Sequence, residues 1–109
     1  MADTVAGFFS ELGGKVDPAK IAGMNAIYQF DITGDGGGTW HVKLADGTAS
    51  VSDGPAESPS ITLTATDANW LDIVSGKLSG QTAFLTGKLK IKGDMSLAMK
   101  LQNVFSLGK

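Results

Sequence analysis

Apolar and polar residues alternate along four successive segments in the middle of this chain. In the first segment, Tyr28, Phe30 and Ile32 are separated by Gln29 and Asp31. A period of two puts every second side chain on the same face of a β-strand. The apolar positions of the next three segments are Trp40, Val42 and Leu44, then Ala49 and Val51, then Ile61, Leu63 and Ala65. The predicted sheet therefore has one apolar and one polar face, as expected for a sheet covered on one side.

Turn sequences separate these predicted strands. Asp46-Gly47 lies between the second and third segments and is a strong signal for a two-residue hairpin. A glycine-rich run, residues 34–38, separates the first two segments. Phosphate-binding loops of similar composition carry a Lys-Ser or Lys-Thr pair and lead into a helix, whereas a strand pattern follows here. The glycine-rich run is therefore predicted to be a plain hairpin.

Helical patterns flank the predicted strands on both sides. Four apolar residues between positions 5 and 12 share one helical face, with Asp3 as the expected N-cap, and a second short helix is expected to begin at Asp17-Pro18. Downstream, Asp67 is the expected N-cap of a helix that ends at Gly76. A helical segment around residues 81–85, a fifth strand at residues 88–92 and a final helix from residue 94 complete the pattern.

The length of 109 residues suits one domain, residues 1–109, with one hydrophobic core. We expect an α+β fold in which helices cover one face of a five-stranded, mostly antiparallel sheet.

The final helix has more apolar surface than packing on a sheet requires. At about 100° per residue, Ser96, Lys100 and Asn103 share a polar arc of only ~60°. The remaining arc of roughly 220° is apolar, against about 100° for a helix that packs on a core. The surplus is expected to meet another helix, a partner chain or an apolar ligand. Gln102 lies inside the apolar arc and needs a hydrogen-bond partner, such as the polar head of a lipid, and Gln81 is a second possible anchor.

Five lysines in the same region have two possible roles. Lys88, Lys90 and Lys92 alternate along the fifth strand, where they could form a plain solvated face of the sheet. Together with Lys77 and Lys100 they could instead meet anionic head groups or an anionic membrane.

Several classes of function are disfavoured by the composition. A net charge of −2 argues against nucleic acid as a partner, and the absence of cysteine removes thiolate chemistry. His41 is the one histidine and is expected on the polar face, so histidine-based metal sites and catalytic triads lack their parts. No cofactor or metal is expected, and no enzymatic activity.

A cytoplasmic location is expected, because the chain has no signal-peptide pattern, no apolar run near ~18 residues and no C-terminal peroxisomal tripeptide.

The C-terminal third is similar to the sterol carrier protein 2 family. The similarity lies in Gly76-Lys-Leu78, in Ala83-Phe-Leu-Thr-Gly-Lys-Leu-Lys-Ile-Lys-Gly-Asp-Met95 and in Leu97-Ala-Met-Lys-Leu-Gln-Asn103. It extends upstream through Asn25-Ala-Ile-Tyr-Gln-Phe-Asp-Ile32 and Trp40-His-Val-Lys-Leu44. Members of this family hold sterols, fatty acids and fatty acyl-CoAs in an apolar tunnel.

The resemblance implies a lipid carrier whose tunnel lies between sheet and helices, with the last helix as its lid. The residues expected at or near the tunnel wall are Phe30, Ile32, Trp40, Val42, Trp70, Ile73, Val74, Phe84, Leu85, Met95, Met99, Leu101, Gln102 and Phe105. A protein-interaction module or homodimer that uses the apolar last helix is the alternative, and a small acyl-processing enzyme ranks below it for want of catalytic groups. A monomer is expected in preference to a dimer.

Overall fold

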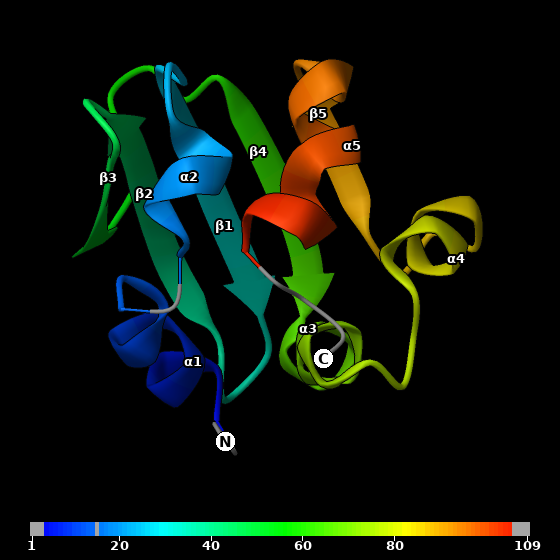
Figure 1. Ribbon diagram of the computed structural model, residues 1–109. Coiled ribbons are helices and arrows are strands. Elements are labelled where there is room, and N and C mark those ends of the chain that lie inside the picture. Colours follow the sequence, from blue (N-terminus) through cyan, green and yellow to red (C-terminus); the bar gives the residue numbers. More distant parts are fainter. Residues whose placement is uncertain (1–3, 15, 106–109) are drawn as a thin grey trace.

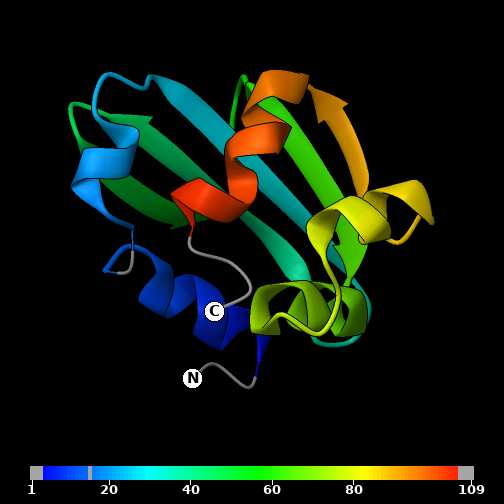
Figure 2. The ribbon, with the colours of Figure 1, turned by 45° about the vertical axis from the view of Figure 1, so that its right-hand side comes forward.

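The computed structural model describes residues 4–14 and 16–105, except for the side chains of residues 101–103. Figures 1 and 2 show a single sheet with most of the helices in front of it. The elements are α1 (Val5–Leu12), α2 (Pro18–Ile21), β1 (Ala26–Thr33), β2 (Gly38–Ala45), β3 (Thr48–Asp53), β4 (Ile61–Thr66), α3 (Asp67–Ser75), α4 (Gly80–Leu85), β5 (Lys90–Gly93) and α5 (Met95–Val104).

The five strands form one mixed sheet in the order β3-β2-β1-β4-β5. Neighbouring strands are antiparallel, except that β1 and β4 run parallel. Tyr28 lies opposite Val42 on one side and Ile61 on the other, and Phe30 lies between Trp40 and Leu63 in the same way. The apolar positions that the sequence alternation predicted therefore form continuous rows across the sheet. The prediction of an α+β fold with a five-stranded, mostly antiparallel sheet is confirmed.

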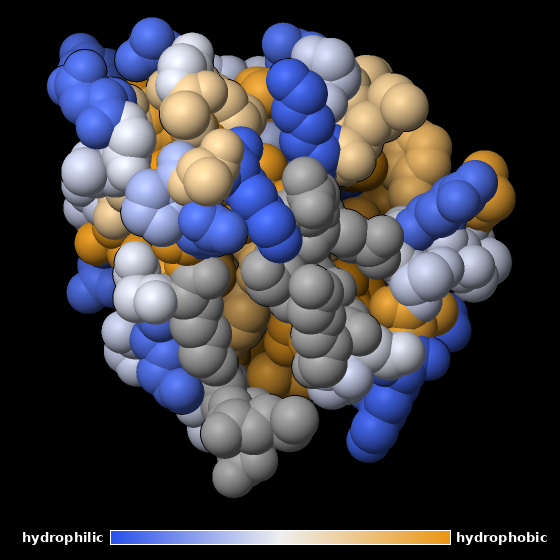
Figure 3. Space-filling view, in the orientation of Figure 1, coloured by the Kyte–Doolittle hydropathy of each residue, from blue (hydrophilic) through white to orange (hydrophobic). Residues whose placement is uncertain are grey.

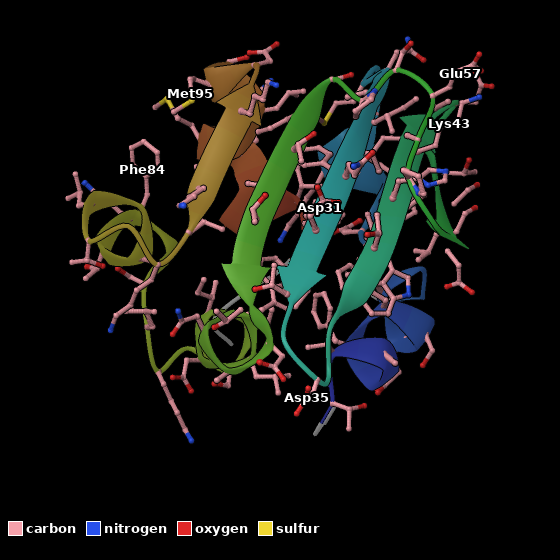
Figure 4. The ribbon with its side chains drawn as sticks, turned by 180° about the vertical axis from the view of Figure 1, so that it is seen from behind. Asp31, Asp35, Lys43, Glu57, Phe84 and Met95 are labelled. Atoms are coloured by element: carbon pink, nitrogen blue, oxygen red, sulfur yellow. The ribbon has the colours of Figure 1, made fainter. Side chains whose placement is uncertain are left out.

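The helices cover the apolar face, and none of the described helices lies on the opposite face of the sheet (Figure 4). The connection between β3 and β4 runs along this outer face. There the Gln29 Oε1 atom accepts a hydrogen bond of 2.9 Å from the Ala56 N–H. His41 lies half-buried beneath the same connection, with its Nδ1 atom 2.8 Å from the carbonyl oxygen of Gly54. The histidine is on the outer face, as expected, but it takes part in holding this loop.

The two predicted hairpins are present. Asp46 and Gly47 both have positive φ values, 54° and 74°, as a type I′ turn between β2 and β3 requires. The glycine-rich run joins β1 to β2, where the Gly37 N–H donates to the Gly34 carbonyl oxygen at 3.1 Å.

One predicted helix cap was wrong. Thr66, not Asp67, is the N-cap of α3, because its Oγ1 atom accepts a hydrogen bond of 3.1 Å from the Asn69 N–H. Asp67 is the first helical residue, and its carboxylate accepts hydrogen bonds from the Ala68 N–H at 2.9 Å and from the Gly36 N–H at 3.0 Å. The carboxylate is therefore used to tie the β1–β2 hairpin to the helix.

At the N-terminal helices, Thr4 is the N-cap of α1, and the expected cap Asp3 lies outside the described residues. Asp17 caps α2 as predicted, with its Oδ1 atom 3.0 Å from the Ala19 nitrogen.

An aromatic cluster fills the space between the sheet and the helices. Phe9 of α1 stacks on Trp40 with ring centroids 4.6 Å apart, and Phe30 lies 5.3 Å from Trp70. Phe105, directly after α5, contacts Tyr28 and Phe30 at 5.0 Å and 5.8 Å. Edge-to-face and stacked aromatic pairs of this kind stabilise a core beyond the burial of their area.

Candidate functional site

An apolar groove of about 410 Å³ lies between α4, β5 and α5. Figure 4 shows Phe84 rising from α4 in the direction of Met95, which stands at the start of α5. The volume falls within the range of about 300–1,000 Å³ that is usual for small-molecule sites. The groove is lined by Gly80, Gln81, Phe84, Leu89, Ile91, Met95, Ala98 and Met99.

The first wall of the groove is α4. This short helix is capped by Ser79, whose Oγ atom accepts a hydrogen bond of 3.1 Å from the Thr82 N–H. Ala83 is fully buried, and its carbonyl oxygen accepts hydrogen bonds from the N–H groups of Lys88 and Leu89 at 2.8 Å and 3.0 Å. These bonds hold the turn into β5, so that Phe84 projects to one side and Leu89 lies buried at the groove.

The second wall is α5, and its first turn is well anchored. The Asp94 Oδ1 atom accepts hydrogen bonds from the backbone N–H and the hydroxyl of Ser96, at 2.9 Å and 2.6 Å. These bonds stabilise the carboxylate and hold the pKa of Asp94 below its usual value. The Tyr28 hydroxyl donates a hydrogen bond of 2.7 Å to the Leu97 carbonyl oxygen, which links α5 to β1. Burial and the nearby Asp94 charge raise the pKa of Tyr28 to about 12.

The apolar surplus of α5 is exposed on the groove side. Leu97 and Val104 are buried against the sheet, whereas 47% of Met95 and 86% of Met99 are exposed. The remaining large apolar side chains with high exposure among the described residues are Phe84 and Leu85 on α4, at 41% and 74%. Exposed apolar surface is therefore concentrated on two neighbouring helices, and exposed patches of this kind mark ligand or interaction sites.

The residues predicted for a tunnel wall lie in several places. Three of the predicted wall residues, Phe84, Met95 and Met99, line the groove together with the predicted polar anchor Gln81. Leu85 is on α4 but is not among the lining residues. The side chains of Leu101 and Gln102 lie outside the described residues.

The other predicted wall residues are part of the core or of its margin. Val74 is half-buried against the core, and Trp40 lines a separate hollow between α1 and the β2–β3 edge of the sheet. Trp70 is fully buried, and its Nε1–H has no hydrogen-bond partner among the described residues. The fully packed residues of the predicted set are Phe30, Ile32, Val42, Trp70, Ile73 and Phe105.

Sequence reasoning missed four lining residues, Gly80, Leu89, Ile91 and Ala98. Leu89 and Ile91 alternate with the three lysines of this segment, which puts them on the other face, but their place at a groove depends on β5 being the edge strand. Ala98 lies one turn after Met95, where a small side chain leaves room beside the helix. That spacing was the one signal available in the sequence.

Among the described residues that line the groove, none has a charged side chain, and Gln81 supplies the one polar side chain. Within the described part of the chain, no group of three or more His, Cys, Asp or Glu residues could hold a metal ion. None of the described helices has the length and apolar character needed to cross a membrane. The arrangement can surround an apolar molecule and offer one amide group to a polar end.

Comparisons with known proteins identify the family of the chain. The SCP-2 sterol transfer family matches residues 9–106. Sterol carrier protein 2 of Bos taurus is 42% identical over 85 residues, which cover 78% of this chain and 16% of the bovine protein. The chain likewise spans 21% of the length of human hydroxysteroid dehydrogenase-like protein 2. It thus corresponds to a small part of these longer relatives.

Solved structures share the fold. The sterol carrier protein domain 2 of Helicoverpa armigera is 32% identical, with a TM-score of 0.75, and the match covers 91% of this chain and 83% of that one. Palmitated SCP2L2 of Aedes aegypti is 29% identical, with a TM-score of 0.73 and coverage of 94% of both chains. The chain belongs to the SCP-2 sterol transfer family of lipid-binding domains.

Proposed function

We propose that the groove between α4, β5 and α5 binds long-chain lipids and that the protein carries them without chemical change. The observation that supports this most directly is the exposure of Phe84, Met95 and Met99 around one uncharged hollow. Leaving such side chains in water costs free energy, which an apolar ligand would recover by covering them.

Burial of the ligand's own apolar surface would supply most of the affinity. Removing roughly 300 Å² of ligand apolar surface from water contributes about 7 kcal/mol, and the covered groove residues contribute in addition. Part of this gain offsets the loss of translational and rotational freedom on binding. We expect affinity in the micromolar range, which corresponds to about 8 kcal/mol.

The ligand class follows from the lining chemistry. Hydrophobic burial is non-directional, so fatty acids, fatty acyl-CoAs and sterols are all candidates. Palmitate is bound to the Aedes aegypti relative, which supports an acyl chain as one occupant. The Gln81 amide could then pair with a polar end of the ligand, and Gln102 remains a second candidate for that role.

Helix α5 is proposed to act as the movable wall that closes over the ligand. Among its described side chains, Leu97 and Val104 are buried in the core, while Met99 is left in solvent. A shift of α5 toward α4 would cover Met99 and extend the groove toward the tunnel that the family resemblance implies.

Carriage is proposed in preference to catalysis because the lining offers no nucleophile, acid or base. Since the longer relatives include a dehydrogenase-like protein, the carried lipid could be passed to an enzyme on the same or another chain. A monomer and a cytoplasmic location remain predictions.

A fluorescent fatty acid titrated into delipidated protein tests the proposal. Saturable binding that unlabelled fatty acid displaces is expected, and Met99→Glu should weaken it at least tenfold by placing a charge against the acyl chain. Ser50→Glu adds the same charge on the exposed outward face of β3 and should change affinity less than twofold. Absence of displaceable binding for fatty acids, acyl-CoAs and sterols alike would refute the carrier, and equal losses in both variants would refute the groove.

A further inference from the structure

The two edges of the sheet are formed by β3 and β5, and they differ in their charge. Lysines are a common device that keeps the edge of a sheet from pairing with another chain. The segment around β5 holds Lys88, Lys90 and Lys92, whereas β3 holds no lysine and no proline, and its one charged residue is Asp53 at its end. In Figure 3, pale side chains of intermediate hydropathy are prominent on the left of the molecule, the side on which β3 lies in Figure 1. The edge at β3 is therefore less protected by charge than the edge at β5.

The backbone of β3 turns hydrogen-bonding groups outward at Val51 and Asp53. The Gly54 N–H donates a hydrogen bond of 2.8 Å to the Thr39 carbonyl oxygen of β2, which makes these two a directly bonded pair. Bonded and non-bonded pairs alternate along an antiparallel ladder, so Ser52 is turned toward β2, and Val51 and Asp53 are turned away from it. No described residue hydrogen-bonds to the outward N–H and C=O groups of Val51 and Asp53, and no described helix or strand lies beyond this edge in Figures 1 and 4. These groups are therefore open to a further strand.

A hollow lies beside this open stretch of β3. At Ala49 the end of α1 approaches the strand, because a Cβ added to Gly13 would lie 3.8 Å from the Ala49 carbonyl oxygen. Val51 and Asp53 instead line a hollow of about 480 Å³, together with Trp40 and residues of α1. Asp53 lies opposite Trp40 in the sheet, so both side chains are on the helix side. A strand added beside β3 would place every second side chain on this same face, at the hollow.

The hollow and the backbone groups together indicate the kind of partner. An acyl chain fits an apolar hollow but offers no partner to the N–H and C=O groups of the edge. A second copy of β3 would offer such groups, but its side chains on this face are Ala49, Val51 and Asp53, which are small or charged and leave a hollow of this size unfilled. It would also bring two Asp53 carboxylates to one edge, which is destabilising. An extended peptide with a large apolar side chain satisfies both the edge and the hollow.

We propose that the open edge of β3 binds an extended segment of a partner protein as an added antiparallel strand. A large apolar side chain of the segment enters the hollow beside Trp40, and a flanking lysine or arginine pairs with the exposed carboxylate of Asp53. In this mode of recognition main-chain hydrogen bonds supply affinity, and the pocket for an alternate side chain supplies specificity. The site is separate from the groove between α4, β5 and α5 and does not depend on the carrier function.

The probe that tests this site is the acetylated and amidated peptide Thr-Lys-Thr-Phe-Thr-Lys-Thr, whose lysines and phenylalanine share one face of a strand. Titrated into the isotope-labelled full chain, it should give saturable NMR shifts at the amides of Val51 and Asp53 and at the Trp40 indole. Serine in place of the phenylalanine should weaken binding about tenfold, because the ring is the part that leaves water. Absence of saturable shifts at these positions up to ~1 mM peptide, the range of weak binding, would overturn the proposal.

Methylation of the peptide nitrogens distinguishes an added strand from adsorption to the hollow. In an antiparallel pair, the peptide residues opposite Val51 and Asp53 direct their N–H groups at β3, and the residues between them direct theirs at solvent. Methylation of the phenylalanine and lysine nitrogens should therefore abolish binding, whereas methylation of the threonine nitrogens between them should change it less than threefold. Equal losses from the two sets would show that the peptide is not an added strand.

A matched pair of charge reversals tests the role of Asp53. Asp53→Lys should weaken binding of the lysine-containing peptide at least fivefold, because it replaces attraction by repulsion. Glu57→Lys makes the same change of charge on the connection between β3 and β4, where Glu57 is exposed (Figure 4), and should alter binding less than twofold. Neither variant should change affinity for the fluorescent fatty acid more than twofold, because neither residue lines the groove. Equal losses in the two variants, displacement of the peptide by fatty acid, or a dimer formed through β3 would overturn the proposal.

Discussion

The phenolic hydroxyl of Tyr28 donates a 2.7 Å hydrogen bond to the carbonyl oxygen of Leu97. Tyr28 is fully buried on the central strand β1, and Leu97 is in the first turns of α5. This bond joins the rigid sheet to the helix that forms one wall of the groove. It therefore adds to the burial of Leu97 and Val104 in holding α5 on the core.

Tyr28→Phe should loosen α5. The substitution leaves a buried carbonyl oxygen without this donor, which costs about 1–3 kcal/mol of unfolding free energy. Urea denaturation measures the global loss, and hydrogen exchange should show the largest change at α5 amides. If α5 keeps its protection while the sheet loses it, the bond does not anchor the helix.

The same tyrosine makes stability depend on alkaline pH. Burial favours the neutral phenol and raises the pKa of Tyr28 from 10.0 to about 12. Between these values the unfolded chain loses its proton while the folded chain keeps it, so unfolding becomes more favourable as pH rises. The free energy of unfolding should be unaffected by this group below pH 10 and fall by about 2 kcal/mol as pH rises to 12.

Because Tyr28 is the one tyrosine of the chain, tyrosinate absorbance follows its titration directly. Tyr28→Phe should lack the corresponding loss of stability. Titration of the folded protein at the ordinary tyrosine pKa would show that the hydroxyl is not buried.

Thr66 and Asp67 should affect stability through different contacts. Thr66→Ala removes the cap of α3 and should cost about 1 kcal/mol. Asp67→Ala releases the Gly36 N–H and should loosen the β1–β2 hairpin. Urea denaturation gives the two losses, and hydrogen exchange should assign them to α3 and to residues 34–38 respectively. Identical exchange patterns would show that Asp67 acts only as part of the helix.

Ligand binding should stabilise the protein, with α5 changing most. Ligand at 100 times its dissociation constant adds about 2.7 kcal/mol, which raises the melting temperature by several degrees. In the delipidated protein α5 should exchange faster than the sheet, because Met95 and Met99 pack against little. Calorimetry and hydrogen exchange with and without fatty acid measure both effects. An unchanged melting temperature under saturating fatty acid would contradict the groove as a ligand site.

The secondary structure was largely readable from local patterns. The alternation through Tyr28, Phe30 and Ile32 placed β1 and its buried face, and Asp46-Gly47 placed a hairpin. These features depend on periodicity and turn chemistry, which are properties of residues close together in the sequence. The cap of α3 was misassigned because Thr66 and Asp67 are both good N-cap residues. The Gly36 N–H, which donates a hydrogen bond to the Asp67 carboxylate, is distant in sequence.

Local patterns were enough to predict the strands, the helices, the apolar face of the sheet and the excess of apolar surface on α5. They could not specify that β4 pairs in parallel with β1, which leaves β5 at the edge with α4 beside it. That arrangement decided which predicted wall residues pack in the core, as Phe30 and Trp70 do, and which line an open groove, as Met95 and Met99 do. The physical reason is that periodicity predicts which face of a strand or helix a side chain lies on. Whether that side chain is buried depends on the residues that pack against it, and these are set by the tertiary structure.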